Sequence, residues 1–157
     1  MPIQGGLPAP DFTLQDENGA ERKLSDFRGH PVVLYFYPKD DTPGCTKEAC
    51  HFRDDYQEYE RAGVVILGVS PDSPKSHTKF KKKYNLPFPL LCDVERQVAK
   101  AYGVLQEKSF LGKKFLGIER TTFLIDGSGK IKKIFPKARV EGHIAEVLAA
   151  LQESSDV

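Results

Sequence analysis

The chain has 157 residues, which is the length of one compact domain, and its 39% hydrophobic and 29% charged residues are typical of a globular protein. Its 23 basic and 22 acidic residues leave a net charge of +1, so no strong field favours nucleic acid or anionic lipid as a partner. No apolar run is long enough to cross a bilayer, and the first residues lack the basic flank and apolar core of a secretory signal. We therefore expect one domain spanning residues 1–157, without a membrane span, in the cytoplasm.

The first quarter of the chain predicts a hairpin and then a central strand. Apolar and polar residues alternate from Phe12 to Leu24 around Asn18-Gly19, a strong two-residue turn signal. The run Pro31–Pro38, "PVVLYFYP", is continuously β-branched and aromatic, as in strands buried on both faces. We expect the hairpin at the periphery of a sheet and this strand in its middle.

Helices and strands alternate through the next part of the chain. Thr46–Ala62 has apolar residues at intervals of three and four, which predicts a helix closed by Gly63. A second buried strand, Val64–Ser70, follows, and the next helix begins with Ser73 as N-cap and Pro74 at its first position. This β-α-β-α order is typical of α/β proteins.

The C-terminal half predicts further elements of the same layers. They are a short strand at Phe88–Asp93, a helix at Val94–Tyr102, a hairpin formed by Thr121–Asp126 and Lys130–Pro136, and a last helix at Glu141–Ser155. Between them, Leu105–Gly117 shows no clear pattern, and we interpret it as a long loop that is functional or mobile and covers a pocket, or equally as a packed structural loop. The fold class expected is α/β, with a mixed central sheet flanked by helices.

The stretch "TPGCTKEAC" combines helix-start signals with two cysteines. Thr42 suits the N-cap and Pro43 the first helical position, so Cys45 falls at the third position. There its sulfur lies near amide groups without helical partners and near the positive end of the helix dipole, which favour thiolate. The position at the carboxyl end of a central strand is also where α/β proteins commonly place their sites. Cys45 is therefore a candidate nucleophile.

Cys50 follows Cys45 at i+5. On an ideal helix that offset separates the two Cα atoms by about 8.7 Å, whereas a disulfide needs roughly 7 Å or less. Either the two cysteines never pair, or the first turns of the helix must unwind. The second alternative suits a cycle in which Cys45 is oxidised first and Cys50 then resolves it.

At these residues the chain resembles the peroxiredoxins, specifically the bacterioferritin comigratory protein or Q-type subfamily. The signature Pro-x3-Thr-x2-Cys is present as Pro38, Thr42 and Cys45, and similarity extends over "LPAPDFTLQDENG", "GVSPDSP", "EKSFLGKKFLGIERTTFLID" and "GKI". The resemblance implies a thioredoxin-like fold, reduction of hydrogen peroxide and organic hydroperoxides without a cofactor, and recycling by thioredoxin or a glutaredoxin-like reductant. Relatives of this type are often monomers, so we expect a monomer.

The resemblance also assigns roles to individual residues. It implies that Cys45 is the peroxidatic cysteine and Cys50 the resolving cysteine. Thr42 would hydrogen-bond the sulfur and the peroxide, and Pro38 would shield the pocket. Arg120, in "GIERTTF", matches an arginine that stabilises the departing oxygen, a role that suits its guanidinium group.

The remaining polar candidates have weaker signals. Glu48 lies one turn after Cys45 and is a possible partner in the site, although the helix dipole alone would account for it. Cys92 is expected to be a small buried residue, although it could compete as the resolving thiol. The sequence "C-x4-C-H" lacks the spacing of a metal site, so no metal is expected, and the histidines at 30, 77 and 143 are expected to be surface or packing residues.

Two other functions use the same cysteines. A thiol-disulfide oxidoreductase of the thioredoxin type would require C-x-x-C, which the chain lacks. A redox sensor or chaperone-like switch would use oxidation of Cys45 and Cys50 to unwind the helix and change a binding surface. Repeated turnover with a dithiol reductant separates a peroxidase from such a sensor.

Overall fold

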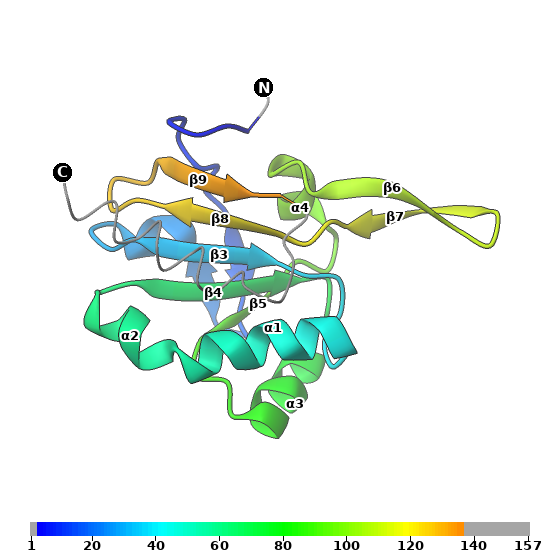
Figure 1. Ribbon diagram of the computed structural model, residues 1–157, viewed down its shortest axis with the longest axis horizontal. Helices are drawn as coiled ribbons and strands as arrows, with labels where there is room; N and C mark the ends of the chain where they lie inside the picture. Colours follow the sequence, from blue (N-terminus) through cyan, green and yellow to red (C-terminus); the bar gives the residue numbers. More distant parts are fainter. Residues whose placement is uncertain (1–2, 137–157) are drawn as a thin grey trace.

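The computed structural model describes residues 3–136, so the helix expected at 141–155 lies outside the described residues. Figure 1 shows a twisted sheet with helices packed against it and one hairpin extending away from the body. The strands are β1 (Thr13–Gln15), β2 (Glu21–Lys23), β3 (Val32–Phe36), β4 (Val65–Ser70), β5 (Leu90–Cys92), β6 (Leu105–Phe110), β7 (Lys113–Ile118), β8 (Thr121–Ile125) and β9 (Ile131–Phe135). The helices are the 3-10 helix Leu24–Phe27 and α1 (Pro43–Asp54), α2 (Tyr56–Arg61), α3 (Pro74–Tyr84) and α4 (Gln97–Ala101).

The central sheet is mixed, as the sequence predicts. Its strand order is β2-β1-β5-β4-β3-β8-β9, in which β3 pairs in parallel with β4 and antiparallel with β8. All five residues of β3 are buried, which confirms the central position expected for this strand. The hairpin expected at 12–24 is also present, because β1 and β2 pair at one edge of the sheet.

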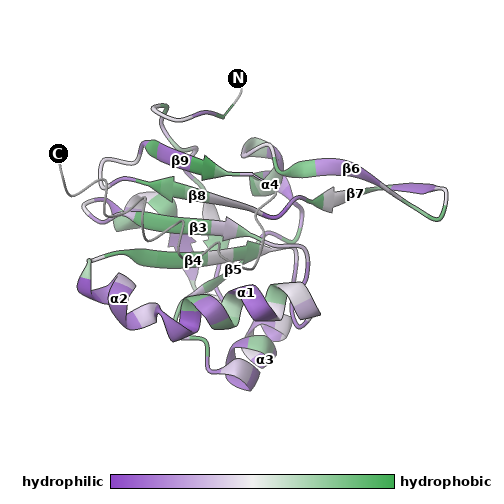
Figure 2. Ribbon diagram, in the orientation of Figure 1, coloured by the Kyte–Doolittle hydropathy of each residue, from purple (hydrophilic) through white to green (hydrophobic). Residues whose placement is uncertain are grey.

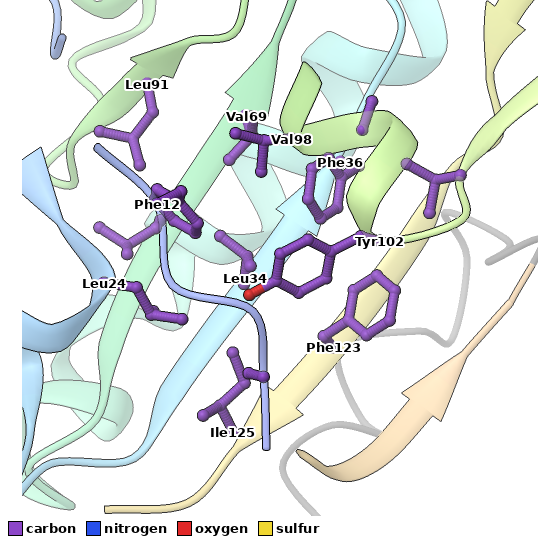
Figure 3. Close-up of a cluster of buried hydrophobic side chains, with 14 of the residues drawn as sticks. Phe12, Leu24, Leu34, Phe36, Val69, Leu91, Val98, Tyr102, Phe123 and Ile125 are labelled. Carbon is purple, nitrogen blue, oxygen red and sulfur yellow. The ribbon is translucent and has the colours of Figure 1, made fainter. Parts of the chain in front are cut away.

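Alternate side chains of β3 build two hydrophobic cores on opposite faces of the sheet. Val33 and Tyr35 point towards α1, α2 and α3, where Tyr35 stacks on Phe52 with ring centroids 4.8 Å apart. Leu34 and Phe36 point to the other face and pack with residues of α4 and of the segment before β1. Figure 3 shows this second core. A strand buried on both faces is stable only with apolar residues at every position, which explains the continuous apolar run.

Hydropathy follows the same layers. In Figure 2 the central strands are largely hydrophobic, whereas α1 and α3 carry extensive hydrophilic surface. Within residues 3–136 no helix is both long enough and apolar enough to cross a bilayer.

The helix expected at 46–62 is two helices, and the first of them begins at Pro43, as the helix-start signals at Thr42 and Pro43 predict. The helix α1 ends at Asp54 and α2 begins at Tyr56, with Asp55 between them at φ −97° and ψ 8°. Aspartate has a low helix propensity, and two of them in succession weaken the helix here. The apolar periodicity continues across the break because Phe52 and Tyr59 are both fully buried in the same core.

The prediction of a loop at 105–117 is wrong, because this segment is the β6–β7 hairpin. The two-residue turn Leu111-Gly112 has positive φ at both positions, 52° and 78°, as tight hairpin turns require. The hairpin extends away from the body of the molecule (Figure 1). Because nearly all of its residues are exposed, neither face has the apolar alternation by which a strand is predicted.

Candidate active site

Cys45 lies at the start of α1, directly after the carboxyl end of the central strand β3. Pro43 occupies the first helical position and Thr42 has the extended backbone of an N-cap, as expected. The Thr42 side chain does not cap the helix; its Oγ1 donates instead to the carbonyl of Lys39 at 2.9 Å. The Cys45 side chain is only 2% exposed. A sulfur at this position lies in the positive field of the first turn.

Sheet pairing brings Arg120 to the same place. Residues Phe36 and Thr121 are partners in the β3–β8 register, so the residue before Thr121 lies beside the segment that leads from β3 into α1. Arg120 Nη2 donates a hydrogen bond to Cys45 Sγ at 3.2 Å. Gly44 permits this approach, because a Cβ atom there would lie 3.2 Å from Arg120 Nη2.

Glu48 completes this group from the next turn of α1. Arg120 Nη1 donates to Glu48 Oε1 at 2.8 Å, so one guanidinium group contacts both the carboxylate and the sulfur. The Glu48 side chain is 1% exposed, and its Oε2 has no hydrogen-bond partner among the described residues. Burial raises the pKa of Glu48 to about 7, although the charge of Arg120 and its hydrogen bond act in the opposite direction. Glu48 therefore titrates near neutral pH.

The arrangement has the chemistry of a nucleophilic thiol site. A guanidinium hydrogen bond and a helix start both stabilise negative charge on Cys45, and the same groups stabilise charge on an oxygen that leaves during attack. The site holds its cation in place before reaction, so little reorganisation is required. This combination is suited to cleavage of a polarisable bond such as the O–O bond of a peroxide.

Two further residues of the expected site lie in the segment between β3 and α1, Pro38 near its start and Thr42 at its end. Pro38 follows the fully buried Tyr37 and is exposed, and Thr42 is partly exposed at the N-cap. Because the Thr42 hydroxyl hydrogen is directed to the carbonyl of Lys39, the lone pairs of Oγ1 remain available as acceptors.

Cys50 lies on the same helix as Cys45, and the helix is continuous between them. Both thiols are free, and Cys50 is partly exposed. Partial burial raises the pKa of the Cys50 thiol, against the lowering effect of Arg53.

Cys92 is separated from this site. It is buried at the end of β5, as expected, and its Sγ lies 3.7 Å from the carbonyl oxygen of Asp16. It lines a cavity of about 490 Å³ between β1 and α4 that does not include Cys45. This cavity is thus not the place of the candidate chemistry.

Sequence reasoning missed the environment of one histidine. His77 is fully buried and lies 2.7 Å from Asp40, in the segment between β3 and α1. The two residues are 37 positions apart, so no local pattern relates them. His30 is exposed, as expected, and His143 lies outside the described residues.

Known proteins are similar to this chain in both sequence and fold. The AhpC/TSA family model matches residues 6–134. The putative peroxiredoxin bcp of Coxiella burnetii is 56% identical over 151 residues, covering 96% of this chain and 100% of that protein, and the peroxiredoxin Bcp of Bacillus subtilis is 50% identical over 156 residues, covering 99% of each. The solved structure of the bacterioferritin comigratory protein of Xanthomonas campestris, which was interpreted in terms of alkyl peroxide reduction, superposes with a TM-score of 0.90 at 41% identity and covers 96% of this chain and 99% of that one.

These matches, which cover almost the whole chain, define the class of protein. The fold is the thioredoxin-like peroxiredoxin fold, which confirms the expected fold class. The chain belongs to the AhpC/TSA family and, within it, to the Bcp or peroxiredoxin Q group, whose members are peroxidases.

Proposed function

We propose that Cys45 is the peroxidatic cysteine of a peroxidase that reduces hydrogen peroxide and organic hydroperoxides. The observation that carries the proposal is the hydrogen bond of Arg120 Nη2 to Cys45 Sγ at the start of α1. The thiolate attacks one peroxide oxygen, the O–O bond breaks, and Cys45 becomes a sulfenic acid. The other oxygen leaves with the bonding electrons and takes a proton, giving water or an alcohol. Arg120 and the helix start stabilise the charge on this leaving oxygen.

Thr42 and Pro38 would shape the peroxide position. The Thr42 oxygen, with its own hydrogen directed to Lys39, would accept a hydrogen bond from the O–H of the bound peroxide. Pro38 would shield the reacting sulfur from water. The alkyl peroxide reduction described for the Xanthomonas campestris relative supports organic hydroperoxides as substrates.

Cys50 would resolve the sulfenic acid. Its sulfur attacks the sulfur of Cys45, a disulfide forms, and water leaves. Because residues at i and i+5 of a helix cannot form a disulfide, the first turns of α1 must unwind before this step. Thioredoxin or a glutaredoxin-like dithiol would then reduce the disulfide by exchange and return the monomeric enzyme to its starting state in the cytoplasm.

Intact-mass analysis after one equivalent of hydrogen peroxide tests this cycle. The wild type is expected to lose the mass of two hydrogen atoms, because peroxide takes two electrons and two protons when the disulfide forms, and to regain it with thioredoxin and its reductase. The variant Cys50→Ser is expected to show a sulfenic acid instead, and Cys45→Ser no rapid reaction. The matched variant Cys92→Ser is expected to behave as wild type; loss of the disulfide in that variant would make Cys92 the resolving thiol.

Turnover separates the peroxidase from a redox sensor. Unwinding of α1 would move Phe52, which is fully buried, so a sensor that exposes an apolar surface is the competing function. A peroxidase consumes many equivalents of peroxide when thioredoxin is supplied. Consumption of a single equivalent per chain, with fresh reductant present, would refute the catalytic cycle.

A further inference from the structure

A buried polar cluster lies behind the segment that joins β3 to α1, and the proposed chemistry does not use it. The carboxylate of Asp40 accepts three hydrogen bonds: from Tyr37 Oη at 2.6 Å, from Ser76 Oγ at 2.8 Å and from His77 Nδ1 at 2.7 Å. Asp40 is 7% exposed and His77 is fully buried. The three donors come from the end of β3 and from α3, so the cluster connects the active-site segment to that helix.

His77 in this cluster is a cation. Its Nε2 lies 2.8 Å from the carbonyl oxygen of Leu91, which only accepts, while its Nδ1 faces the carboxylate of Asp40. Both ring nitrogens therefore carry hydrogens. Burial acts to lower the pKa of His77, but the hydrogen bonds and the charge of Asp40 outweigh burial and raise it to about 10. Asp40 and His77 form a buried ion pair.

The cluster is not arranged as a metal site. Ligand atoms of Asp40, Asp72 and His77 all lie within 4.8 Å of one another, so a metal is the obvious alternative. However, Nδ1 of His77 and Oδ2 of Asp40 are 2.7 Å apart, a hydrogen-bond distance, whereas two tetrahedral zinc ligands would be separated by about 3.3 Å. A metal would also require Nδ1 to give up the hydrogen that it donates to Asp40.

The peptide group between Lys39 and Asp40 is hydrogen-bonded at both of its polar atoms. The N–H of Asp40 donates to Asp72 Oδ2 at 2.8 Å, and Asp72 is held in turn by Ser70 Oγ at 2.7 Å. The C=O of the same peptide group, that of Lys39, accepts the hydrogen bond from Thr42 Oγ1 at 2.9 Å. Because a peptide group is planar, fixing its N–H fixes the direction of its C=O. The orientation of the Thr42 hydroxyl thus depends on the cluster.

The next residue shows that the segment is held against α3 at a second point. Asp41 has φ 56°, a left-handed conformation that is uncommon for a residue other than glycine. Its carboxylate accepts from Lys83 Nζ and from Tyr84 Oη, both at 2.8 Å and both at the end of α3. The backbone between Asp40 and Thr42 is therefore constrained on both sides.

We propose that His77 and Asp72 are positioning residues that aim the Thr42 hydroxyl. Together with Asp40 they fix the peptide group between Lys39 and Asp40. The carbonyl of that group accepts the hydrogen bond from the Thr42 hydroxyl, so the lone pairs of Thr42 Oγ1 can accept a hydrogen bond from a bound peroxide. This inference rests on the proposed function, because it assumes that Thr42 Oγ1 accepts a hydrogen bond from the peroxide that Cys45 reduces.

A double-mutant cycle between His77 and Thr42 tests the proposal. The measurement is the rate of Cys45 oxidation by hydrogen peroxide in a single turnover, quenched by alkylation and followed by intact mass. Thr42→Val is expected to slow the reaction about tenfold, the effect of one hydrogen bond. His77→Gln is expected to slow it by a similar factor, and Thr42→Val is expected to cause little further loss in the His77→Gln background. Equal effects of Thr42→Val in both backgrounds, or an unchanged rate in His77→Gln, would overturn the proposal.

Matched variants separate positioning from stability. His30→Gln is the control, because His30 is exposed and precedes β3, at the end of that strand opposite the site; its rate is expected to equal that of the wild type. Asp72→Ala removes the carboxylate that accepts the hydrogen bond from the Asp40 N–H. Because Asp72 is partly exposed, this variant is expected to fold, and it replaces His77→Gln in the double-mutant cycle with Thr42→Val if His77→Gln does not fold. Thermal unfolding is recorded for each variant, and a merely structural role would lower the unfolding temperature without coupling to Thr42. A wild type that does not react with peroxide would instead refute the proposed function.

Discussion

Arg120 Nη2 donates a hydrogen bond of 3.2 Å to the sulfur of Cys45, and these two residues are 75 positions apart in the chain. The contact exists because β8 pairs antiparallel with β3, which places the start of one strand beside the end of the other. One guanidinium group, shared with Glu48, thereby supplies positive charge beside the sulfur that we propose as the nucleophile. The predictions below test what this group and its surroundings do.

Arg120→Met is expected to slow oxidation of Cys45 by peroxide on the order of 10²-fold, because it removes a preorganised donor from the reacting atoms. Arg120→Lys is expected to recover only part of the rate, since an ammonium group lacks the planar fork that contacts both Cys45 and Glu48. Single-turnover kinetics measure both variants. Arg61→Met, on the exposed side of α2, is the control. If Cys45 is oxidised at the same rate in Arg120→Met as in Arg61→Met, Arg120 takes no part in the mechanism.

Gly44→Ala is expected to slow the reaction of Cys45 with peroxide without destabilising the fold. Alanine is favoured over glycine in a helix by about 0.5–1 kcal/mol, so the free energy of unfolding is expected to stay the same or rise. The new Cβ would lie 3.2 Å from Arg120 Nη2, so the guanidinium must shift and the oxidation of Cys45 is expected to slow several-fold. Urea unfolding and single-turnover kinetics give the two quantities. A rate that does not fall would show that Arg120 adjusts without loss.

Glu48→Gln is expected to reduce the pH dependence of stability. Because the pKa of Glu48 is raised from 4.5 to about 7 in the folded state, the folded chain holds the proton more tightly than the unfolded chain. The resulting stabilisation is complete below about pH 4.5 and is lost as the pH rises through 7. The fall in the free energy of unfolding from pH 4.5 to pH 8 is therefore expected to be smaller in Glu48→Gln, by on the order of 1–3 kcal/mol. Urea unfolding at several pH values checks this, with the exposed Glu58→Gln as control; parallel curves for the wild type and Glu48→Gln would contradict it.

Phe110 and Phe52 are expected to differ sharply in their effect on stability. Phe110 in the β6–β7 hairpin is 68% exposed, so Phe110→Ala is expected to change the free energy of unfolding by no more than about 0.5 kcal/mol. Phe52 in α1 is fully buried, and Phe52→Ala is expected to cost about 3–5 kcal/mol. Denaturant unfolding of both variants gives the comparison. A large loss in Phe110→Ala would mean that the hairpin packs against another surface.

Local patterns in the sequence determined the central strand, the start of α1 and the position of Cys45. The apolar run of β3 can be stable only in the middle of a sheet, and the Thr-Pro pair starts a helix by restricting its own backbone. These features depend only on residues that are neighbours in the sequence, so local patterns predict them. The β6–β7 hairpin was missed because an exposed pair of strands has no alternating apolar pattern in the sequence.

The partners of Cys45 were decided by the tertiary structure. Resemblance pointed to Arg120, but its simultaneous contact with Cys45 and Glu48 follows from the register of β3 and β8. Likewise, the ion pair of Asp40 and His77 forms because α3 packs beside the segment after β3. Charge and hydrogen bonding act over a few ångströms in space, whatever the separation along the chain, so these relationships exist only once the sheet and its helices have assembled.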